Sequence, residues 1–246
     1  MKIAYISDYS PLDINAWSGT PYYVYQSLSK KHTVVWIGKD LFCGAYWYHK
    51  FNNKRTPFYP HDYSPEICHL LSEEIKAGDF DIVITSLYIM ISCLDINIPI
   101  VYYSDIIYIL CKDNYFPMTK ELEHRAITRE REALERADII VFSSEIVKKA
   151  AIDFYGIPAQ KIKVIEFGAN IPDPQNIDLE TYNTDHCHLT FVGRDWKRKG
   201  GDMMIDIYKC LKTQGFNCDL TIIGSHVNKN INGINVIPFL VLQDLV

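Results

Sequence analysis

Four positively charged side chains lie in one short segment, FVGRDWKRKGGD at residues 191–202, between a hydrophobic run and two glycines. Arginine can hold a phosphate through two parallel hydrogen bonds, and lysine adds a point charge. Glycine at a helix start lets the backbone approach a ligand, where N–H groups and the helix dipole favour an anion. The segment therefore predicts a phosphate-binding turn that comprises Gly193, Arg194, Lys199 and Gly200.

Two familiar phosphate-binding motifs are absent from the sequence. Neither G-x-G-x-x-G nor G-x-x-x-x-G-K-[ST] occurs, so neither a dinucleotide fingerprint nor a P-loop is present. The alternative interpretation of the basic segment is a solvated surface loop, because isolated runs of charge usually lie at the surface.

A second glycine turn, Ser18-Gly19-Thr20, opens a helical stretch after the first apolar run. Gly19 permits close backbone approach, and the N–H groups there favour an anion. The alternative is that Ser18 or Thr20 caps the helix and Gly19 only makes the turn. One such turn in each of two domains would suit a diphosphate-bearing ligand held between the domains.

Composition limits the classes of function. The chain has 246 residues and a net charge of −5, which argues against a general nucleic-acid binder. The seven cysteines are scattered without a C-x-x-C pair, so we expect reduced thiols in a cytoplasmic protein. We see no signal peptide and no uncharged run near the roughly 20 residues that a membrane span needs.

Two groups of histidine and cysteine could suggest a metal site. They are His61 with Cys68 and His69, and the tripeptide His186-Cys187-His188. Neither group completes a four-ligand pattern, so we expect no metal.

Alternating apolar runs and helical stretches indicate the fold class. Strands are predicted at 2–8, 33–38, 81–86, 98–105, 138–144, 162–168, 188–193, 219–224 and 234–239, and helices at 20–31, 64–78, 119–136, 145–156 and 201–214. Such alternation predicts an α/β protein with parallel sheets. We expect a complete doubly wound, Rossmann-like domain at 1–170, a linker at 171–187 and a partial second domain at 188–246.

The ordered motifs resemble those of family 4 glycosyltransferases, which have the GT-B fold. SDYSPLDINAWSGTPYYVYQSL resembles their N-terminal glycine loop and first helix. ALERADIIVFSSEIVKKAAIDFYGIPAQKIKVIEFGANI is similar to the end of their first domain, and FVGRDWKRKGGD with CDLTIIGS resembles the start of their second. The resemblance covers the whole chain but about two thirds of a complete enzyme.

The resemblance implies a mechanism. A nucleotide-diphosphate sugar binds mainly to the second domain and a sugar or lipid-linked acceptor to the first. Arg194 and Lys199 match the basic pair that holds the donor diphosphate, and Gly19 matches the glycine that packs near the donor. Transfer is expected to retain the anomeric configuration and to need neither a metal nor another cofactor. Synthesis of a surface polysaccharide or glycolipid is the expected role.

Asp105 ends the run IPIVYYSD, where many family members carry a histidine near the reacting sugar. An aspartate there could bind a sugar hydroxyl or stabilise positive charge at the anomeric carbon. The alternative is a strand-end aspartate that shapes the next turn. Ser144, Glu166 and Asn170 occupy other strand ends or the crossover and could line a cleft.

The main departure from the family lies at the C-terminus. Two glutamates eight residues apart, which contact the donor in the family, would come after residue 246. The chain is therefore expected to be a fragment or a shortened protein. Alternative functions are a non-catalytic remnant that binds nucleotide weakly or serves as an interaction protein, and a sugar-nucleotide epimerase of the same fold.

The segment 36–63 is rich in aromatic residues with interleaved lysine and arginine. It could stack on sugar rings or rest peripherally on a membrane near a lipid-linked acceptor. We favour the alternative, a long loop that packs on its own domain.

Overall fold

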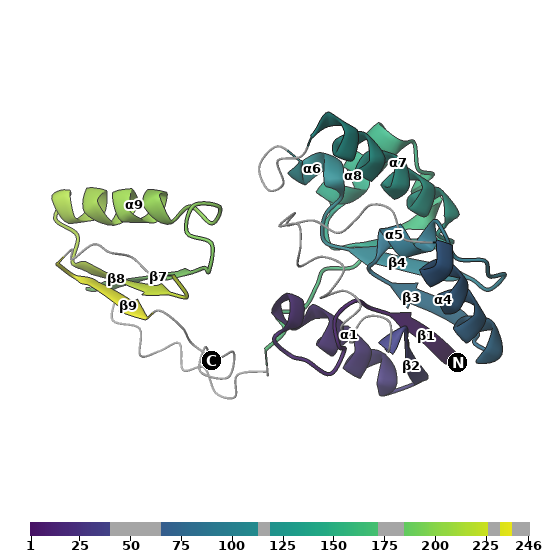
Figure 1. The fold of residues 1–246 in the computed structure, drawn as a ribbon. Coiled ribbons are helices and arrows are strands. Elements are labelled where there is room, and N and C mark those ends of the chain that lie inside the picture. The colour runs from purple at the N-terminus through teal and green to yellow at the C-terminus, as the bar shows by residue number, and fades with distance from the viewer. Residues whose placement is uncertain (40–64, 113–118, 172–184, 226–231, 238–246) are drawn as a thin grey trace. The chain divides into compact units, whose positions relative to one another are not determined.

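In the computed structural model, the described residues are 1–39, 65–112, 119–171, 185–225 and 232–237. The chain divides into two compact units, Met1–Asn170 and Ile171–Val246. Each contains a parallel sheet, with several helices packed on it in the first unit and one described helix in the second (Figure 1). The predicted α/β fold class is confirmed.

The sheet of the first unit has the strand order β2-β1-β3-β4-β5-β6 among the described residues. The strands are β1 (Lys2–Ile6), β2 (Thr33–Ile37), β3 (Ile82–Thr85), β4 (Ile100–Ser104), β5 (Ile139–Phe142) and β6 (Ile162–Val164), all paired in parallel. The chain runs from β1 outward to β2 and then returns to β3 on the other side of β1. The carboxyl ends of β1 and β3 therefore flank the topological switch point, where open α/β sheets bind ligands.

Helices cover both faces of this sheet. Figure 1 shows α1 (Thr20–Ser29) on the opposite side of the strands from α7 (Lys120–Arg136) and α8 (Glu145–Tyr155). The helices α4 (Pro65–Ala77) and α5 (Tyr88–Ile91) share one buried core with α7 and α8. The sheet contributes Ala4, Ile6, Tyr102 and Phe142 to that core, among others.

Two helices of four residues, α5 and α6 (Tyr108–Cys111), were not predicted from the sequence. One helical turn is too short for hydrophobic periodicity to reveal. The longer helices begin and end at ordinary signals. Ser144 accepts a hydrogen bond from the Val147 N–H at the start of α8, and left-handed Gly156 (φ 73°) ends it as predicted. The predicted cap of α4, Ser64, lies outside the described residues.

The second unit has the described strands β7 (Cys187–Val192), β8 (Cys218–Ile223) and β9 (Ile234–Ile237), in the order β7-β8-β9. Helix α9 (Gly201–Thr213) packs on one face of this sheet. The core between them contains Phe191, Ile205, Tyr208, Leu220 and Ile222. Residues that alternate with these along β7 and β8 lie on the other face.

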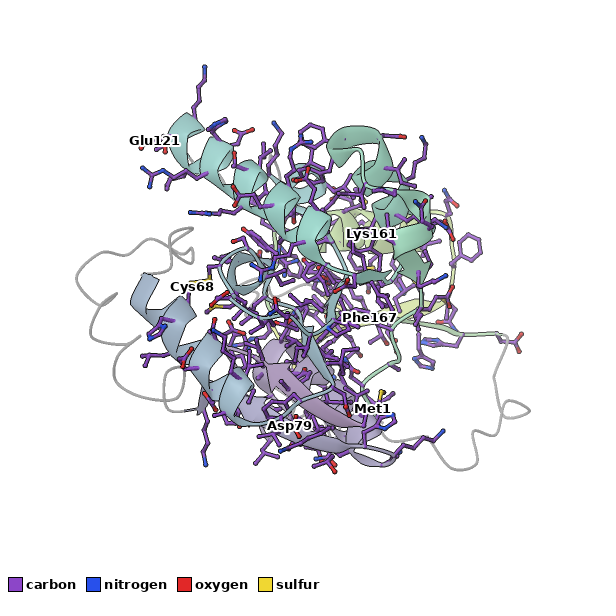
Figure 2. The ribbon with its side chains drawn as sticks, turned by 90° about the vertical axis from the view of Figure 1, so that its right-hand side faces the viewer. Met1, Cys68, Asp79, Glu121, Lys161 and Phe167 are labelled. Carbon is purple, nitrogen blue, oxygen red and sulfur yellow. A yellow bond between two sulfur atoms is a disulfide. The ribbon has the colours of Figure 1, made fainter. Side chains whose placement is uncertain are left out.

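The expectation of reduced cysteines is wrong for one pair. Cys68 on α4 and Cys93 after α5 form a disulfide with a Cα–Cα distance of 5.6 Å, and sulfur lies beside the Cys68 label in Figure 2. The two cysteines are 25 residues apart in sequence, and only the packing of α4 beside α5 brings them together. Cys111, Cys187, Cys210 and Cys218 are free.

No helix among the described residues is long and apolar enough to span a bilayer. The aromatic segment, which we expect to be a loop that packs on its own domain, lies outside the described residues from residue 40 onward. Within its described part, the Trp36 indole N–H donates to the Ser7 carbonyl at 3.0 Å.

Candidate functional site

The basic turn of the second unit starts at Gly193, directly after β7. The Gly193 N–H donates to the Ile223 carbonyl at 2.9 Å, and the Ser225 hydroxyl donates to the Gly193 carbonyl. A Cβ at position 193 would lie 3.1 Å from the Phe191 ring and 3.2 Å from Lys199 Cβ. Because residue 193 is glycine, the Lys199 side chain can pack against the backbone directly before Arg194.

The two glycines at the start of α9 shape the turn. Gly200 is the N-cap in the left-handed region (φ 80°), which glycine adopts without strain. A Cβ on Gly201 would lie 2.2 Å from the Trp196 ring, so the indole packs directly on the first helical residue. The Gly201 N–H donates to the Trp196 carbonyl at 2.8 Å and the Gly200 N–H to the Lys197 carbonyl at 3.3 Å. The N–H groups of Gly200 and Gly201 are therefore used within the turn itself.

Asp195 organises one of the four cations. The backbone N–H of Arg198 donates to Asp195 Oδ1 at 3.1 Å, and Arg198 Nε donates to Oδ2 at 3.1 Å. The Arg198 N–H and guanidinium, and to a smaller extent the charge of Lys199, hold the pKa of Asp195 below its usual range. Within the described part of the second unit, the exposed side chains of Arg194 and Lys199 form no ion pair. Arg198 therefore stabilises the turn, whereas Arg194, Lys197 and Lys199 are exposed and available to an anion.

The glycine loop of the first unit is strained. Trp17 (φ 43°), Ser18 (φ 53°) and Gly19 (φ 82°) are consecutive residues with left-handed backbone. Residues other than glycine rarely adopt this backbone conformation, which costs of order 1–3 kcal/mol for each such residue. A Cβ on Gly19 would lie 3.2 Å from the Tyr23 ring and 3.3 Å from the Ile14 carbonyl oxygen. Strain of this kind clusters at functional sites.

Neither Ser18 nor Thr20 caps α1, so the capping part of that alternative is wrong, whereas Gly19 does make the turn. The N-cap is Gly19, without a side-chain cap among the described residues. The Thr20 N–H donates to the Trp17 carbonyl, and Pro21 has no N–H, so the first two residues of α1 offer no donor to an anion. Asn170 instead fixes the loop, because its Nδ2 donates to the Ser18 carbonyl at 3.1 Å and to Thr20 Oγ1 at 3.0 Å.

Asp105 is exposed at the carboxyl end of β4. In the turn after this strand, Ser104 Oγ donates to the Ile106 carbonyl at 2.7 Å and accepts from the Ile106 N–H at 3.3 Å. Of the other candidates, Ser144 caps α8, and Glu166 is exposed after β6.

A buried carboxylate holds the segment that follows Asp105. Glu130 on α7 is 2% exposed, and its two oxygens accept the Tyr108 N–H at 3.0 and 2.9 Å. The Tyr155 hydroxyl donates to the same carboxylate. Burial raises the pKa of Glu130 to about 7, although the Tyr155 and Tyr108 hydrogen bonds favour the ionised form. Sequence reasoning missed Glu130, yet it lies four residues after Ala126 on the apolar face of α7, which is an available signal.

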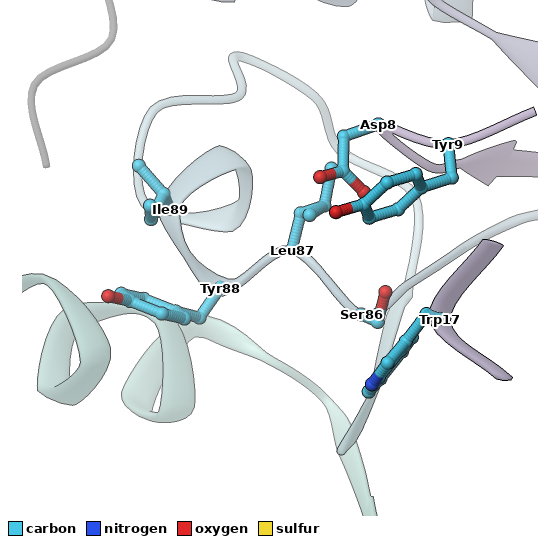
Figure 3. A pocket seen from close by; sticks show the side chains of 7 residues that line it. All are labelled: Asp8, Tyr9, Trp17, Ser86, Leu87, Tyr88 and Ile89. Atoms are coloured by element: carbon cyan, nitrogen blue, oxygen red, sulfur yellow. The ribbon is translucent and has the colours of Figure 1, made fainter. Parts of the chain in front are cut away.

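A pocket of about 270 Å³ lies at the switch point of the first sheet. Asp8 and Tyr9 follow β1, and the run from Ser86 to Ile89 follows β3. Figure 3 shows Asp8 and Tyr9 on one side of Leu87 and Tyr88 with Ile89 on the other. Trp17, from the strained loop, completes the lining. Asp105 is not among the described lining residues.

Sequence analysis missed Asp8 and Ser86 in this pocket. The available signal was their position, because each is among the first polar residues after two strands that proved to be neighbours. Trp17 also stacks beside Tyr103, with ring centroids 6.5 Å apart and an interplanar angle of 22°. The Tyr103 hydroxyl forms a hydrogen bond of 2.6 Å with the Tyr5 hydroxyl, so the wall behind Trp17 is rigidly supported.

The sequence profile of Glycosyltransferase Family 4 matches residues 22–171. This match spans more than half of the 246 residues and runs from α1 through Asn170. The chain belongs to Glycosyltransferase Family 4. The recognition made from the glycine loop, the basic turn and the crossover is thereby confirmed. No curated protein matches the sequence significantly.

Solved structures confirm the GT-B fold. The lipopolysaccharide outer core galactosyltransferase WaaB, in its apo form, aligns with a TM-score of 0.54 at 17% identity. A glycosyltransferase from Rickettsia africae ESF-5 aligns with a TM-score of 0.54 at 15% identity, and S. aureus MnaA, solved with UDP, with 0.50 at 10%. The alignments cover 93%, 96% and 99% of this family 4 chain, which spans 62%, 67% and 70% of those chains, respectively.

Proposed function

We propose that this family 4 protein is a glycosyltransferase that takes its sugar from a nucleotide-diphosphate sugar. The observation that carries the proposal is that the cations of the basic turn differ in whether they form an ion pair. Asp195 engages Arg198, while Arg194 and Lys199 are exposed and form no ion pair in the described part of the unit. The similarity to S. aureus MnaA, which was solved with UDP, supports a nucleotide ligand.

The proposed roles of Arg194 and Lys199 follow from the position at which negative charge develops during sugar transfer. When the bond between the sugar's anomeric carbon and the diphosphate breaks, its electron pair goes to the diphosphate oxygen. Arg194 can hold that diphosphate through two hydrogen bonds, and Lys199 adds a positive charge, so both stabilise the leaving group. The acceptor oxygen forms the new bond to the anomeric carbon, and its proton passes to the departing diphosphate oxygen. We propose retention of configuration and no metal in this step.

The acceptor is proposed to bind in the pocket at the switch point. Tyr9 and Trp17 offer aromatic faces on which sugar rings can stack, and Asp8 and Ser86 offer polar atoms for hydroxyl groups. A sugar or a lipid-linked sugar fits this chemistry, consistent with a role in polysaccharide or glycolipid synthesis. Asp105 is proposed to bind a hydroxyl of the reacting sugar.

A thermal-shift titration of the full chain tests the proposal. UDP, GDP, ADP, CMP and their common sugars are compared, since ligand at about 100 times its Kd adds about 2.7 kcal/mol of stability. We expect a shift selective for one nucleotide diphosphate, and loss of that shift in Arg194→Ala and Lys199→Ala. Lys209→Ala, which removes an exposed charge from α9, is the matched control and should keep the shift.

Product analysis then separates the classes of enzyme. A transferase converts the donor to free nucleotide diphosphate and joins the sugar to an added acceptor, whereas an epimerase changes the donor sugar without an acceptor. A folded chain that responds to no nucleotide would contradict the proposal.

A further inference from the structure

Two histidines and an aspartate meet at the amino-terminal edge of the second sheet. His188 is the second residue of β7 and pairs in register with Asp219 on β8. His186 lies two residues earlier, and its ring centroid is 4.3 Å from that of His188. The His186 Nε2 atom is 3.1 Å from Asp219 Oδ2, and His188 Nδ1 is 2.9 Å from Asp219 Oδ1.

We propose that His186, His188 and Asp219 bind a divalent transition-metal ion, with Zn²⁺ as the best match. One ligand atom from each residue lies within 4.8 Å of the other two. Zinc bonds to imidazole nitrogen and carboxylate oxygen are about 2.0–2.2 Å long, which places two tetrahedral ligand atoms about 3.4 Å apart. Small side-chain rotations from the hydrogen-bonded arrangement therefore open a site for the ion.

The donor set defines the class of ion. Two imidazoles with one carboxylate suit zinc and its neighbours in the first transition row, whereas calcium and magnesium prefer oxygen ligands alone. Three protein ligands leave a fourth position for water. Asp219 is 42% exposed and His188 is 69% exposed, so the ion can enter from solvent.

The backbone fixes the ligands before an ion binds. The Cys187 N–H donates to the Asn217 carbonyl at 2.9 Å, and Asn217 Nδ2 donates to the Asp185 carbonyl at 3.2 Å. Asp185 and Cys187, which flank His186, are thus both hydrogen-bonded to Asn217, close to Asp219 in the chain. A bound ion would add a bond between the starts of β7 and β8 and stabilise the second unit.

This site is separate from the basic turn. His188 and Asp219 are the second residues of their strands and lie on the face opposite α9, because their neighbours Leu189 and Leu220 pack toward the core beneath that helix. Arg194 follows the other end of β7. Metal binding can therefore succeed or fail independently of nucleotide binding. The earlier expectation of no metal considered only ligands adjacent in sequence and did not include Asp219.

Zinc binding to the full chain without a polyhistidine tag tests the inference. Competition with a chromophoric chelator gives the affinity and the stoichiometry. We expect one Zn²⁺ per chain, with affinity lowered by at least about tenfold in His188→Gln and in Asp219→Asn, since even outer-shell partners cost that much. His124→Gln, an exposed histidine on α7, is the control and should bind as the unaltered chain does.

Co²⁺ substitution in the unaltered chain gives a second readout that does not depend on variants. Imidazole and carboxylate ligands predict visible d–d bands without a thiolate charge-transfer band. A thiolate band, loss of binding in Cys187→Ser but not in His188→Gln, or no stoichiometric Zn²⁺ would each overturn the inference. Circular dichroism in the presence of a chelator verifies that each variant is folded.

Discussion

Replacing the buried Glu130 by glutamine should change how the stability of the first unit depends on pH. Glu130 is 2% exposed, and its carboxylate holds the N–H of Tyr108, at the start of α6. Burial raises its pKa from an ordinary 4.5 to about 7. Glutamine has nearly the same shape and keeps an oxygen for the Tyr108 N–H, but it cannot ionise.

The direction in which stability changes with pH follows from the raised pKa of Glu130. The folded protein favours protonated Glu130 more strongly than the unfolded chain does. The stability from this preference is therefore fully present below pH 4.5 and is lost as the pH rises through 7. Between pH 5 and 8 the unaltered chain should lose about 2 to 3 kcal/mol relative to Glu130→Gln, because each pH unit between the two pKa values contributes about 1.4 kcal/mol.

Urea unfolding followed by far-UV circular dichroism at pH 5, 6, 7 and 8 measures the difference. Glu135→Gln, an exposed glutamate on the same helix, is the control, and its difference from the unaltered chain should stay nearly constant with pH. If the Glu130→Gln difference is also constant over this range, burial does not raise the pKa of Glu130, and the reasoning is refuted.

Three further changes test the local geometry. Gly201→Ala places a methyl group against the Trp196 ring and should destabilise the second unit by about 1–3 kcal/mol in urea unfolding; an unchanged midpoint would mean that the ring does not pack there. Gly19→Ala forces a side chain into the left-handed region, so a loss of about 1–2 kcal/mol is expected, and a stabilised variant would show that the loop is not left-handed. Replacing Cys68 and Cys93 together by alanine opens a loop between cysteines 25 residues apart and should cost about 3 kcal/mol under non-reducing conditions; equal numbers of reactive thiols before and after reduction of the denatured unaltered chain would show that no disulfide forms.

The strands and long helices were predictable because local signals determine them. Apolar runs bounded by glycine and polar residues marked every described strand, and Gly156 marked the end of α8 where the structure places it. The basic turn was predictable for the same reason, because Arg194, Lys199 and the glycines are close in sequence. Its hydrogen bonds were not predictable, since a sequence does not show that the glycine N–H groups close the turn.

Features that depend on tertiary packing were missed. The disulfide requires α4 to lie beside α5, and the pocket requires β1 and β3 to be neighbours in the sheet. The cluster of His186, His188 and Asp219 depends on the register between β7 and β8. Each joins residues far apart in the chain, and periodicity within one element carries no information about such pairs.

The most direct test of the central claim is a calorimetric comparison of nucleoside diphosphate and monophosphate binding to the full chain and its variants. If Arg194 and Lys199 bind a diphosphate group, the nucleoside diphosphate binds more tightly than the monophosphate. Arg194→Ala should remove most of that preference, a loss of about 10- to 100-fold for a charge-assisted hydrogen bond, while Lys209→Ala retains it. Equal affinity for the two nucleotides, or a preference that persists in Arg194→Ala, would contradict a donor site at this turn.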